Sequence, residues 1–559
     1  MRLRDGNGMI FSVVIEKNKN ELDKLANWLK FNRSQKDNGS DRSNEVFSVS
    51  RDYSTYEMTV KSKITIDDYQ RITSTSDWNL LKNFATSLAD KTIVFINPTF
   101  EGGGVAMLRP PLIHMLQQFG VDAHWYVMAN MQNPNDPSPF IFTKQMHNIL
   151  QRQAPANVRI TDEGKATHRK WSAENAVVIT AQKNIQNADV IVIDDPQPSG
   201  LKKYIEKVNP NVKWVWRNHI DTDGKLMSDP SSPQGEVASY LLDECGMRGV
   251  EAVITHPVAA FVYPSMSDKT YFAPATIDSF DDLNRTLNNH EVQVGIDFIN
   301  NQISQKNAEF LSENRESDIQ SLIDPNKRRI VLIARFDESK GMDKAMKLGI
   351  RVRRKMRQEK FIETDLPQVI IVGNGSVDDP SGETIYEEVL RIRRELYAND
   401  KKGIIAMRLK HNYSAINALM YQRQRNNDEN ISEVVAMQTS DAEGFETRIS
   451  DWIKHGVPVV VSNRGGMSLQ VVEGKSGFIL DFDKPDYDME RGVDFIYSLM
   501  TDYEKYTSFR HSTLEMAERY NNREFSTTAN ATRFARIFNN VLAGNNADKI
   551  WKISELVDK

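Results

Sequence analysis

The chain has 559 residues, of which 40% are hydrophobic and 26% are charged, and its formal net charge is -5 at pH 7. This length suffices for two or three domains with sizeable cores. The mildly negative charge argues against nucleic acid or an anionic membrane as a partner, and the single cysteine, Cys245, excludes an internal disulfide and argues against a cysteine-based metal site.

The sequence indicates neither a membrane segment nor a secretory signal. No run of 18 apolar residues is present, so we expect no transmembrane helix. The N-terminal stretch becomes charged again directly after a short apolar run, which is not typical of a secretory signal. We therefore predict a cytoplasmic protein with small-molecule partners and with no nucleic-acid or membrane partner, and we leave a homodimer open.

Residues 1–65 are predicted to form a small N-terminal α+β extension. The pattern predicts a strand over 9–16, a helix over 19–31, and a hairpin formed by 45–51 and 56–64. The segment between the helix and the hairpin is polar and typical of a disordered loop. No residue of this extension indicates chemistry.

From residue 66 onward, short apolar runs alternate with helical patterns, which is typical of a doubly wound parallel sheet. Two Rossmann-like domains are expected, and a cleft between two such domains is where ligands usually bind. The predicted strands are 92–96, 121–127, 188–194, 212–216 and 251–255, then 328–336, 368–375, 403–407, 433–437 and 457–462. The predicted units are a first domain over 66–290, a connecting segment over 291–325, a second domain over 326–500, and C-terminal helices over 501–559.

The most informative stretch is 434–478, which predicts a strand, an acidic loop, a helix, a second strand and a second helix. Glu443 lies in the acidic loop, and Gly456 ends the first helix. Gly465 and Gly466 are expected to open the second helix. Ligands in such folds lie beyond the carboxyl ends of the strands, at helix N-termini, so Glu443 and the glycine pair are candidate ligand contacts.

A run of glycines lies between a predicted strand and the helix that follows it. Gly102, Gly103 and Gly104 let the backbone approach a ligand closely. A tight turn is the simpler interpretation, but three glycines exceed what a turn needs, and the spacing is not the dinucleotide fingerprint. Pro110 and Pro111 are expected to kink or interrupt the helix.

Two cations follow the first strand of the second domain. Arg335 leaves the end of the strand, and Lys340 starts the next helix. Two cations five residues apart are common on solvated surfaces. Their position at the carboxyl end of a strand nevertheless suits a phosphate leaving group, whose developing charge they would stabilise. Both are therefore candidate catalytic residues.

Polar side chains also follow the strands of the first domain. His219 and Asp221 are candidates for contacts with sugar hydroxyls, and Asp221 is assigned to the acceptor. His256 is a weaker candidate because a single histidine is more often structural. The triplet 221–223 matches the acidic pattern with which some sugar transferases hold a metal. We discount that match and expect no metal cofactor, because the cationic pair can neutralise a phosphate.

Together these stretches resemble the retaining GT-B glycosyltransferases of family 4. Within that family the likeness is to the trehalose synthases and the retaining fungal-type trehalose phosphorylases, and it covers roughly residues 66–540. It implies two domains that face a cleft, with the last helices crossing back onto the first domain. The stretches that carry it include GGGVAMLRPPLIHMLQQFGVDAHWYVM, DDPQP, RNHID, SSPQGEV, FAPATIDSFDDLN, ARFDESKG and EGFETRISDWIKHGVPVVVSNRGG.

The resemblance assigns roles position by position. Arg335 and Lys340 match the phosphate-binding pair, and Glu443 matches the acid that holds the hydroxyls of the donor glucose. The glycines at 102–104 match the loop that faces the donor phosphate. His219 matches a histidine that contacts the donor hexose.

Three positions depart from the pattern of nucleotide-using members. Asp451 stands where those members have a second Glu that grips the ribose, and its side chain is one methylene shorter. Glu446 gives EGFE where many transferases have EGFG, as in the phosphorylase-type branch, and Asp194 stands where related synthases often have His. Because Asp451 keeps the charge of a ribose contact, we favour a nucleotide-glucose donor.

The sequence therefore predicts a retaining glucosyltransferase of trehalose metabolism, which transfers glucose from a nucleotide-glucose to a sugar acceptor, expected to be glucose. One alternative is a retaining trehalose phosphorylase that uses phosphate and glucose 1-phosphate. Another is a non-catalytic sugar-binding homologue, but a pure sugar binder has little use for the cationic pair. A dehydrogenase is disfavoured because neither domain opens with a dinucleotide fingerprint.

Overall fold

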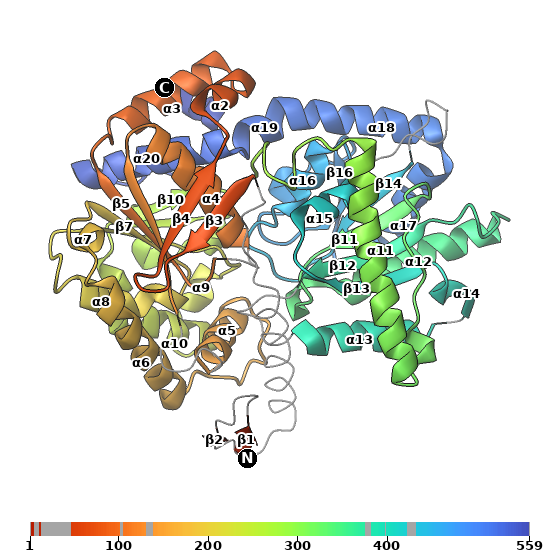
Figure 1. Cartoon of the computed structure of the whole chain (residues 1–559), viewed down its shortest axis with the longest axis horizontal. Helices are drawn as coiled ribbons and strands as arrows, with labels where there is room; N and C mark the ends of the chain where they lie inside the picture. Colours follow the sequence, from red (N-terminus) through yellow and green to blue (C-terminus); the bar gives the residue numbers. More distant parts are fainter. Residues whose placement is uncertain are drawn as a thin grey trace.

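The computed structural model describes residues 2–4, 10–12, 46–100, 104–129, 138–374, 382–396, 398–421 and 432–557. Two α/β domains lie side by side, each built around its own central sheet (Figure 1). The fold class of two Rossmann-like domains is thereby confirmed. The strands β1 (Arg2–Arg4) and β2 (Ile10–Ser12) pair antiparallel in a separate ribbon. The helix predicted over 19–31 lies outside the described residues.

The first domain contains an eight-stranded sheet with the order β10-β9-β8-β7-β5-β6-β4-β3. The six strands from β10 to β6 are parallel and covered on both faces, which explains why their sequences are nearly continuous apolar runs. These strands are β5 (Thr92–Asn97), β6 (Asp122–Val127), β7 (Val190–Asp194), β8 (Lys213–Arg217), β9 (Ala252–Thr255) and β10 (Thr270–Phe272).

The predicted hairpin is present as β3 (Phe47–Arg51) and β4 (Glu57–Ser62), but it does not belong to a separate unit. β4 pairs antiparallel with β6, so the hairpin extends the first sheet at one edge. Its alternate apolar residues Phe47, Val49, Met58 and Val60 are buried in the same core cluster as the helices of the first domain. The expectation of an independent extension was wrong for this segment, because one face of the hairpin is apolar and needs that cover.

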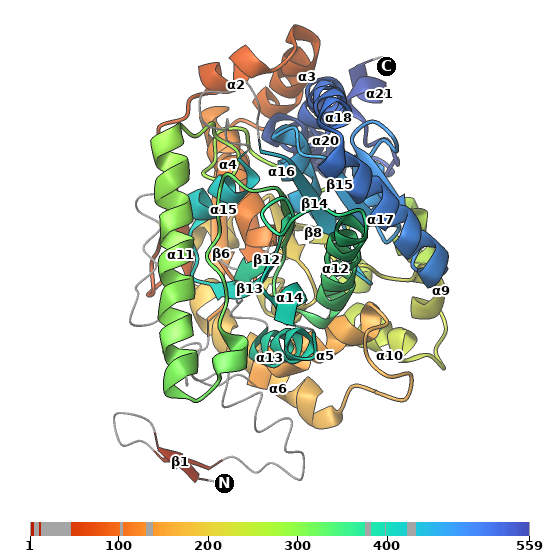
Figure 2. The same cartoon turned by 90° about the vertical axis from the view of Figure 1, so that its right-hand side faces the viewer.

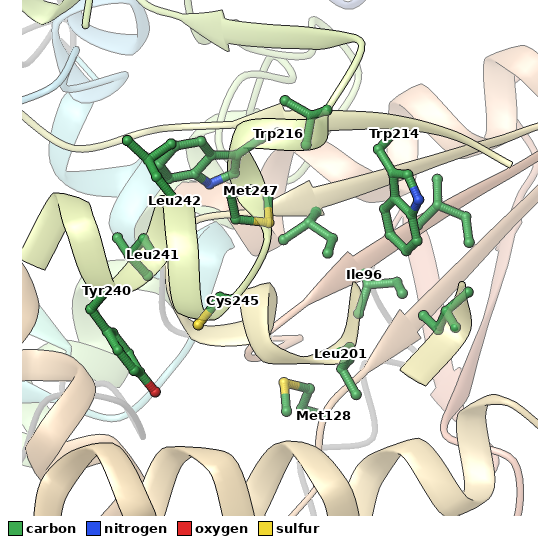
Figure 3. Packing of buried hydrophobic residues seen from close by; sticks show 14 of the residues in the cluster. Ile96, Met128, Leu201, Trp214, Trp216, Tyr240, Leu241, Leu242, Cys245 and Met247 are labelled. Carbon is green, nitrogen blue, oxygen red and sulfur yellow. The ribbon is translucent and has the colours of Figure 1, made fainter. Parts of the chain in front are cut away.

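Helices cover both faces of the first sheet. One face carries α3 (Thr75–Thr86), α4 (Gly104–Gln118) and α20 (Thr527–Ala543). The other carries α5 (Ser138–Leu150), α6 (Asp162–Ile179) and α10 (Pro233–Ser239), above a core that includes Trp214, Trp216 and Tyr240 (Figure 3). Shorter helices are α2 (Ile66–Ile72), α7 (Lys183–Gln186), α8 (Lys202–Ile205) and α9 (Gly224–Met227).

The second domain contains a six-stranded parallel sheet with the order β13-β12-β11-β14-β15-β16. Five strands match predicted runs, whereas β16 was missed because it is short and follows a polar turn. The helix predicted to open at Arg464 is also absent, and only a single 3-10 turn forms at Ser468–Gln470. The strands are β11 (Arg329–Ile333), β12 (Gln368–Asn374), β13 (Ile404–Leu409), β14 (Val434–Gln438), β15 (Val459–Ser462) and β16 (Gly477–Leu480).

Helices again cover both faces of this sheet. α11 (Asn289–Ser312), which Figures 1 and 2 show lengthwise, carries most of the predicted connecting segment and packs into the second domain. It shares one face of the sheet with α15 (Tyr413–Met420) and α16 (Arg448–Lys454). The other helices are α12 (Met342–Gln358), α13 (Gly382–Arg394), α14 (Ala398–Lys401), α17 (Pro485–Thr501) and α18 (Tyr503–Met516). Within the described ranges, no helix is both long and apolar enough to cross a membrane.

The chain crosses between the domains twice. It leaves the first domain after β10, and it returns near α19 (Asn522–Glu524) so that α20 packs on the first sheet (Figure 1). The Ile277 N–H donates to the Phe525 carbonyl at 2.8 Å, so the two crossing segments are bonded to each other. Beyond them, Phe534 and Phe538 of α20 lie 5.9 and 6.0 Å from the Phe95 ring of β5, and α21 (Ile553–Val557) follows.

Candidate active site

A cavity of about 230 Å³ lies between the two domains, at the carboxyl ends of strands from both sheets. The first domain contributes the residues after β5, β7, β8 and β9, together with the start of α4 and one side of α5. The second domain contributes the end of β12 and the residues after β11, β13 and β14. Among the predicted site residues, Gly104, His219, Arg335, Lys340 and Glu443 line this cavity.

Lys340 occupies a buried position between two carboxylates. Its side chain is only 9% exposed, its Nζ lies 2.7 Å from Glu446 Oε2, and it also contacts the Glu443 carboxylate directly. Burial opposes the charged form of a lysine, but the two carboxylates outweigh burial and raise the pKa of Lys340. The ammonium is therefore charged at neutral pH and fixed at the wall of the cavity.

A close approach of two backbone segments places Lys340. Gly341 has φ +58°, and a Cβ there would lie 2.1 Å from the Thr439 carbonyl oxygen. Only glycine permits this contact between the turn after β11 and the end of β14. Arg335, five residues before Lys340, lines the same cavity. The strand-end pattern thus brings together the cationic pair and Glu443, which lie about a hundred residues apart in the chain.

On the first domain, His219 belongs to a buried ionic network. Its Nε2 lies 2.8 Å from Asp194 Oδ1, and Arg109 grips the same carboxylate through Nε at 3.1 Å and Nη2 at 2.5 Å. Burial and the neighbouring Arg217 lower the pKa of His219 to about 4, so the imidazole is neutral at pH 7. Against the opposing effect of burial, Arg109 and His219 lower the pKa of Asp194. The network holds a neutral His219 ring at the cavity.

Asp221, assigned to the acceptor, is not among the residues that line the cavity. Its Oδ2 accepts a hydrogen bond from the Glu443 backbone N–H at 3.4 Å, and its Oδ1 lies 2.8 Å from Arg152 Nη2. Burial raises the pKa of Asp221 to about 6. Asp221 therefore joins the two domains behind the Glu443 loop. Asp223 caps α9 and also meets Arg152, and no cluster of three potential metal ligands occurs within the described segments.

The two glycines after β15 support the Glu443 loop and do not line the cavity. A Cβ at Gly465 would lie 1.6 Å from the Glu443 carbonyl oxygen, and one at Gly466 would lie 2.6 Å from the Phe445 ring. The Gly466 N–H donates to the Gly444 carbonyl at 2.9 Å. The structure gives this pair a packing role, and its donor contact stays a prediction. The close approach of the loop also explains why no α-helix opens there.

The glycine run before α4 is described only in part. Gly102 and Gly103 lie outside the described residues, so their predicted contact with the donor phosphate stays a prediction. Gly104 begins α4 and lines the cavity. Pro110 and Pro111 were expected to kink or interrupt this helix. They do not interrupt it, because α4 continues through both, and both prolines are buried.

Asp451 is not among the residues that line the cavity. Its side chain is 1% exposed, Oδ1 accepts a hydrogen bond from Asn284 Nδ2 at 2.9 Å, and Oδ2 lies 2.5 Å from Arg448 Nη1. Arg448 itself lines the cavity. The assignment of Asp451 to the donor ribose therefore has no support in this geometry. Its shorter side chain instead holds Arg448, so a third cation reaches the site.

The comparisons with known proteins agree with this architecture. A family model described as "Trehalose synthase, N-terminal domain" matches residues 95–261. A trehalose phosphorylase of Pleurotus pulmonarius is 32% identical over 458 residues, 79% of this chain and 57% of the relative. A trehalose synthase of Thermococcus litoralis is 28% identical over 416 residues, 74% of this chain and 84% of the relative. The chain is a homologue of these trehalose phosphorylases and trehalose synthases.

A solved structure shows which fold this chain has. The UDP-forming α,α-trehalose-phosphate synthase of Burkholderia xenovorans, in complex with glucose 6-phosphate, matches with a TM-score of 0.55. The match covers 80% of this chain and 100% of that chain at 12% identity, which shows a shared GT-B fold alone. The chain spans 57% of the length of the Pleurotus relative that it matches.

Several residues of this GT-B homologue line the site without having been predicted. Glu446 and Arg448 belong to the stretch EGFETR and line the cavity. The sequence indicated only that Glu446 departs from the EGFG pattern. Lys144 of α5 forms a 2.5 Å ion pair with Asp337 after β11, which joins the two domains at the wall of the cavity. These partners are separated by 193 residues, so no local pattern could indicate them. Gln197 and His147 also line the cavity.

Glu443 gives the first prediction. Burial and the neighbouring Glu446 raise its pKa to about 7, against the opposing effect of Lys340. In the unfolded chain its pKa is near 4.5, so the folded state binds the extra proton, and stability falls as pH rises from 4.5 to 7. Glu443→Gln removes this penalty. The free energy of unfolding of Glu443→Gln, measured in urea, should therefore increase relative to that of the parent as the pH rises from 4.5 to 7. A constant difference between pH 4.5 and 8 would contradict the assignment.

Proposed function

We propose that this protein is a retaining glucosyltransferase of trehalose metabolism, in which the transferred glucosyl group moves between a phosphate and a second glucose. The observation that carries the proposal is the position of Arg335 and Lys340 at the end of β11, lining the same cavity as the start of α4. Two cations and a helix N-terminus offer a preorganised positive field for a phosphate. The trehalose phosphorylase and trehalose synthase relatives support the sugar substrate.

In the direction of trehalose cleavage, a phosphate oxygen attacks the anomeric carbon from the face from which glucose departs. The new C1–O bond forms as the glycosidic C1–O bond breaks, and the phosphate proton passes to the departing glucose oxygen. The products are α-glucose 1-phosphate and glucose. No protein nucleophile takes part. Arg335 and Lys340 stabilise the charge on the phosphate, and Glu443 and the neutral His219 hold the hydroxyls of the transferred glucose.

One observation favours phosphate over a nucleotide as the anionic substrate. Asp451 holds Arg448 and is not among the residues that line the cavity, so its carboxylate is not available there to bind a ribose. We therefore propose a trehalose phosphorylase, which reverses the preference for nucleotide-glucose drawn from the charge of Asp451.

A nucleotide-glucose reaction is the second candidate, and one observation favours it. The chain spans 84% of the length of the Thermococcus trehalose synthase but 57% of the Pleurotus trehalose phosphorylase. The match therefore extends over a larger share of the synthase than of the phosphorylase. A non-catalytic sugar binder has neither a use for three cations at one cavity nor a reason to bury Lys340 between two carboxylates.

Turnover with a panel of substrates tests the proposal. Trehalose with inorganic phosphate should give glucose and α-glucose 1-phosphate, detected by chromatography and by the phosphorus NMR signal of the axial anomer. Omitting phosphate should abolish the reaction. Nucleotide-glucose with free glucose should give no trehalose above the background of a Lys340→Ala variant. Formation of trehalose from nucleotide-glucose, with no phosphate-dependent cleavage, would promote the second candidate.

A further inference from the structure

Glu446 has a strained backbone at the wall of the cavity. Its φ is +58°, in the left-handed region that residues with a Cβ adopt rarely. A glycine would occupy this position without strain. Strained residues cluster at functional sites, where other contacts of the folded chain hold them. The contacts of the Glu446 side chain therefore indicate what the strain accomplishes.

Both carboxylate oxygens of Glu446 are engaged within the site. Oε2 lies 2.7 Å from Lys340 Nζ, and Oε1 accepts a hydrogen bond from the Arg448 backbone N–H at 3.3 Å. The side chain is 9% exposed. Against the opposing effect of burial, Lys340 lowers the pKa of Glu446, so its carboxylate is ionised at neutral pH. Glu446 thus links the lysine after β11 to the first turn of α16.

Lys340 needs such a link because an ammonium on a flexible four-carbon side chain has no preferred position of its own. Glu443 alone would hold Lys340 at one point. Glu446 adds a second anchor, and together they fix Nζ at the cavity. We propose that Glu446 is a positioning residue that holds Lys340 for the phosphate, and that the backbone strain at 446 is retained for this contact. The inference rests on the proposed phosphate-dependent function.

Glu446 also affects the protonation of Glu443. The negative charge of Glu446 raises the pKa of Glu443, so removing that charge should lower it. The titratable and charged groups around Glu443 are Lys340 and Arg335 after β11, Glu446 in its own loop, and Asp221, His219 and His256 from the first domain. Of these groups, only Glu446 is changed in the test below. A shift of the acidic limb of the pH–activity profile therefore reports the loss of the Glu446 charge.

Paired substitutions separate the strain from the carboxylate. Glu446→Gly and Glu446→Ala both lack the carboxylate, but only the glycine variant relieves the backbone. Lys360 provides a matched control, because it is exposed, has φ +69° and lies far from the cavity at the end of α12. At both positions the glycine variant should melt above the alanine variant, by roughly 1 °C or more. The melting temperatures require no substrate.

Turnover of trehalose with inorganic phosphate tests the positioning role. Glu446→Gly and Glu446→Ala should both lose kcat by roughly 10- to 100-fold, the scale for a misplaced catalytic group, and their KM for phosphate should rise more than their KM for trehalose. Both Lys360 variants should keep parental kcat. Glu446→Gln keeps the side-chain size, and the acidic limb of its pH profile should move below pH 7.

The outcomes distinguish the inference from the function on which it rests. If the parent protein turns over no trehalose and no donor, the proposed function fails. In that case the rise in melting temperature caused by inorganic phosphate still tests the inference, because Glu446→Gln should reduce it. If the parent is active and Glu446→Gly keeps its kcat and phosphate KM, the carboxylate has no positioning role. A smaller glycine–alanine gap at 446 than at 360 would overturn the role of strain.

Discussion

Lys340→Ala is expected to lower kcat by roughly 100-fold or more, because it removes a preorganised charge that stabilises the phosphate in the transition state. Arg335→Ala should have an effect of similar size for the same reason. Steady-state kinetics with trehalose and phosphate measure both losses. Lys347, an exposed lysine of α12 paired with Asp343, is the matched control, and its alanine variant should keep parental kcat.

Lys340→Ala should also destabilise the fold, which the sequence alone did not suggest. The lysine is buried between Glu443 and Glu446, so its removal leaves two carboxylates without a counter-ion. Breaking one partner of a buried ionic group costs about 3–5 kcal/mol. The loss in free energy of unfolding should be larger at pH 8 than at pH 5, where a proton can neutralise one carboxylate. Parental kcat in the alanine variant would show that Lys340 does not contact the phosphate.

Asp194 gives the second large expected effect. Asp194→Leu leaves the buried Arg109 without its counter-ion, so the free energy of unfolding should fall by about 3–5 kcal/mol. The double variant Arg109→Met/Asp194→Leu replaces both charges by apolar groups and should recover most of this loss. Denaturant unfolding of Asp194→Leu, Arg109→Met and the double variant measures the coupling energy between the two residues.

Activity should not recover along with stability in this cycle. His219 depends on Asp194 for the orientation of its ring, since its Nε2 lies 2.8 Å from that carboxylate. The double variant should therefore remain well below parental kcat even when it is as stable as the parent. Recovery of both quantities would mean that the network serves folding alone and that His219 does not need it.

The sequence predicted the parts of the fold that local patterns determine. Parallel strands are buried on both faces, so the five runs in each domain were recognisable as apolar segments. Arg335, Lys340 and Glu443 were found because the carboxyl ends of such strands gather at one site. β16 escaped notice because GFIL is only four residues long and two of them are half-buried.

The predicted contacts that the geometry does not support involve residues with distant partners. Asp451 was given to a ribose, but its partner Asn284 lies 167 residues away in the chain. Gly465 and Gly466 were given to the donor, but the backbone they accommodate belongs to the loop after β14. The strain at Glu446 arises in the folded backbone. The sequence EGFE therefore identified the position as unusual but did not indicate its left-handed φ.

Because the chain crosses between the domains twice, the first domain is formed from two parts of the chain, and the second domain is inserted between them. The core of the first sheet includes Phe534 and Phe538 of α20, which lie in the chain beyond every strand of the second domain. During synthesis, the second domain can therefore complete its core while the first still lacks one of its covering helices. The helix that completes the core of the first sheet is thus synthesised after every strand of the second domain, and the apolar face that it covers is exposed on the nascent chain until then.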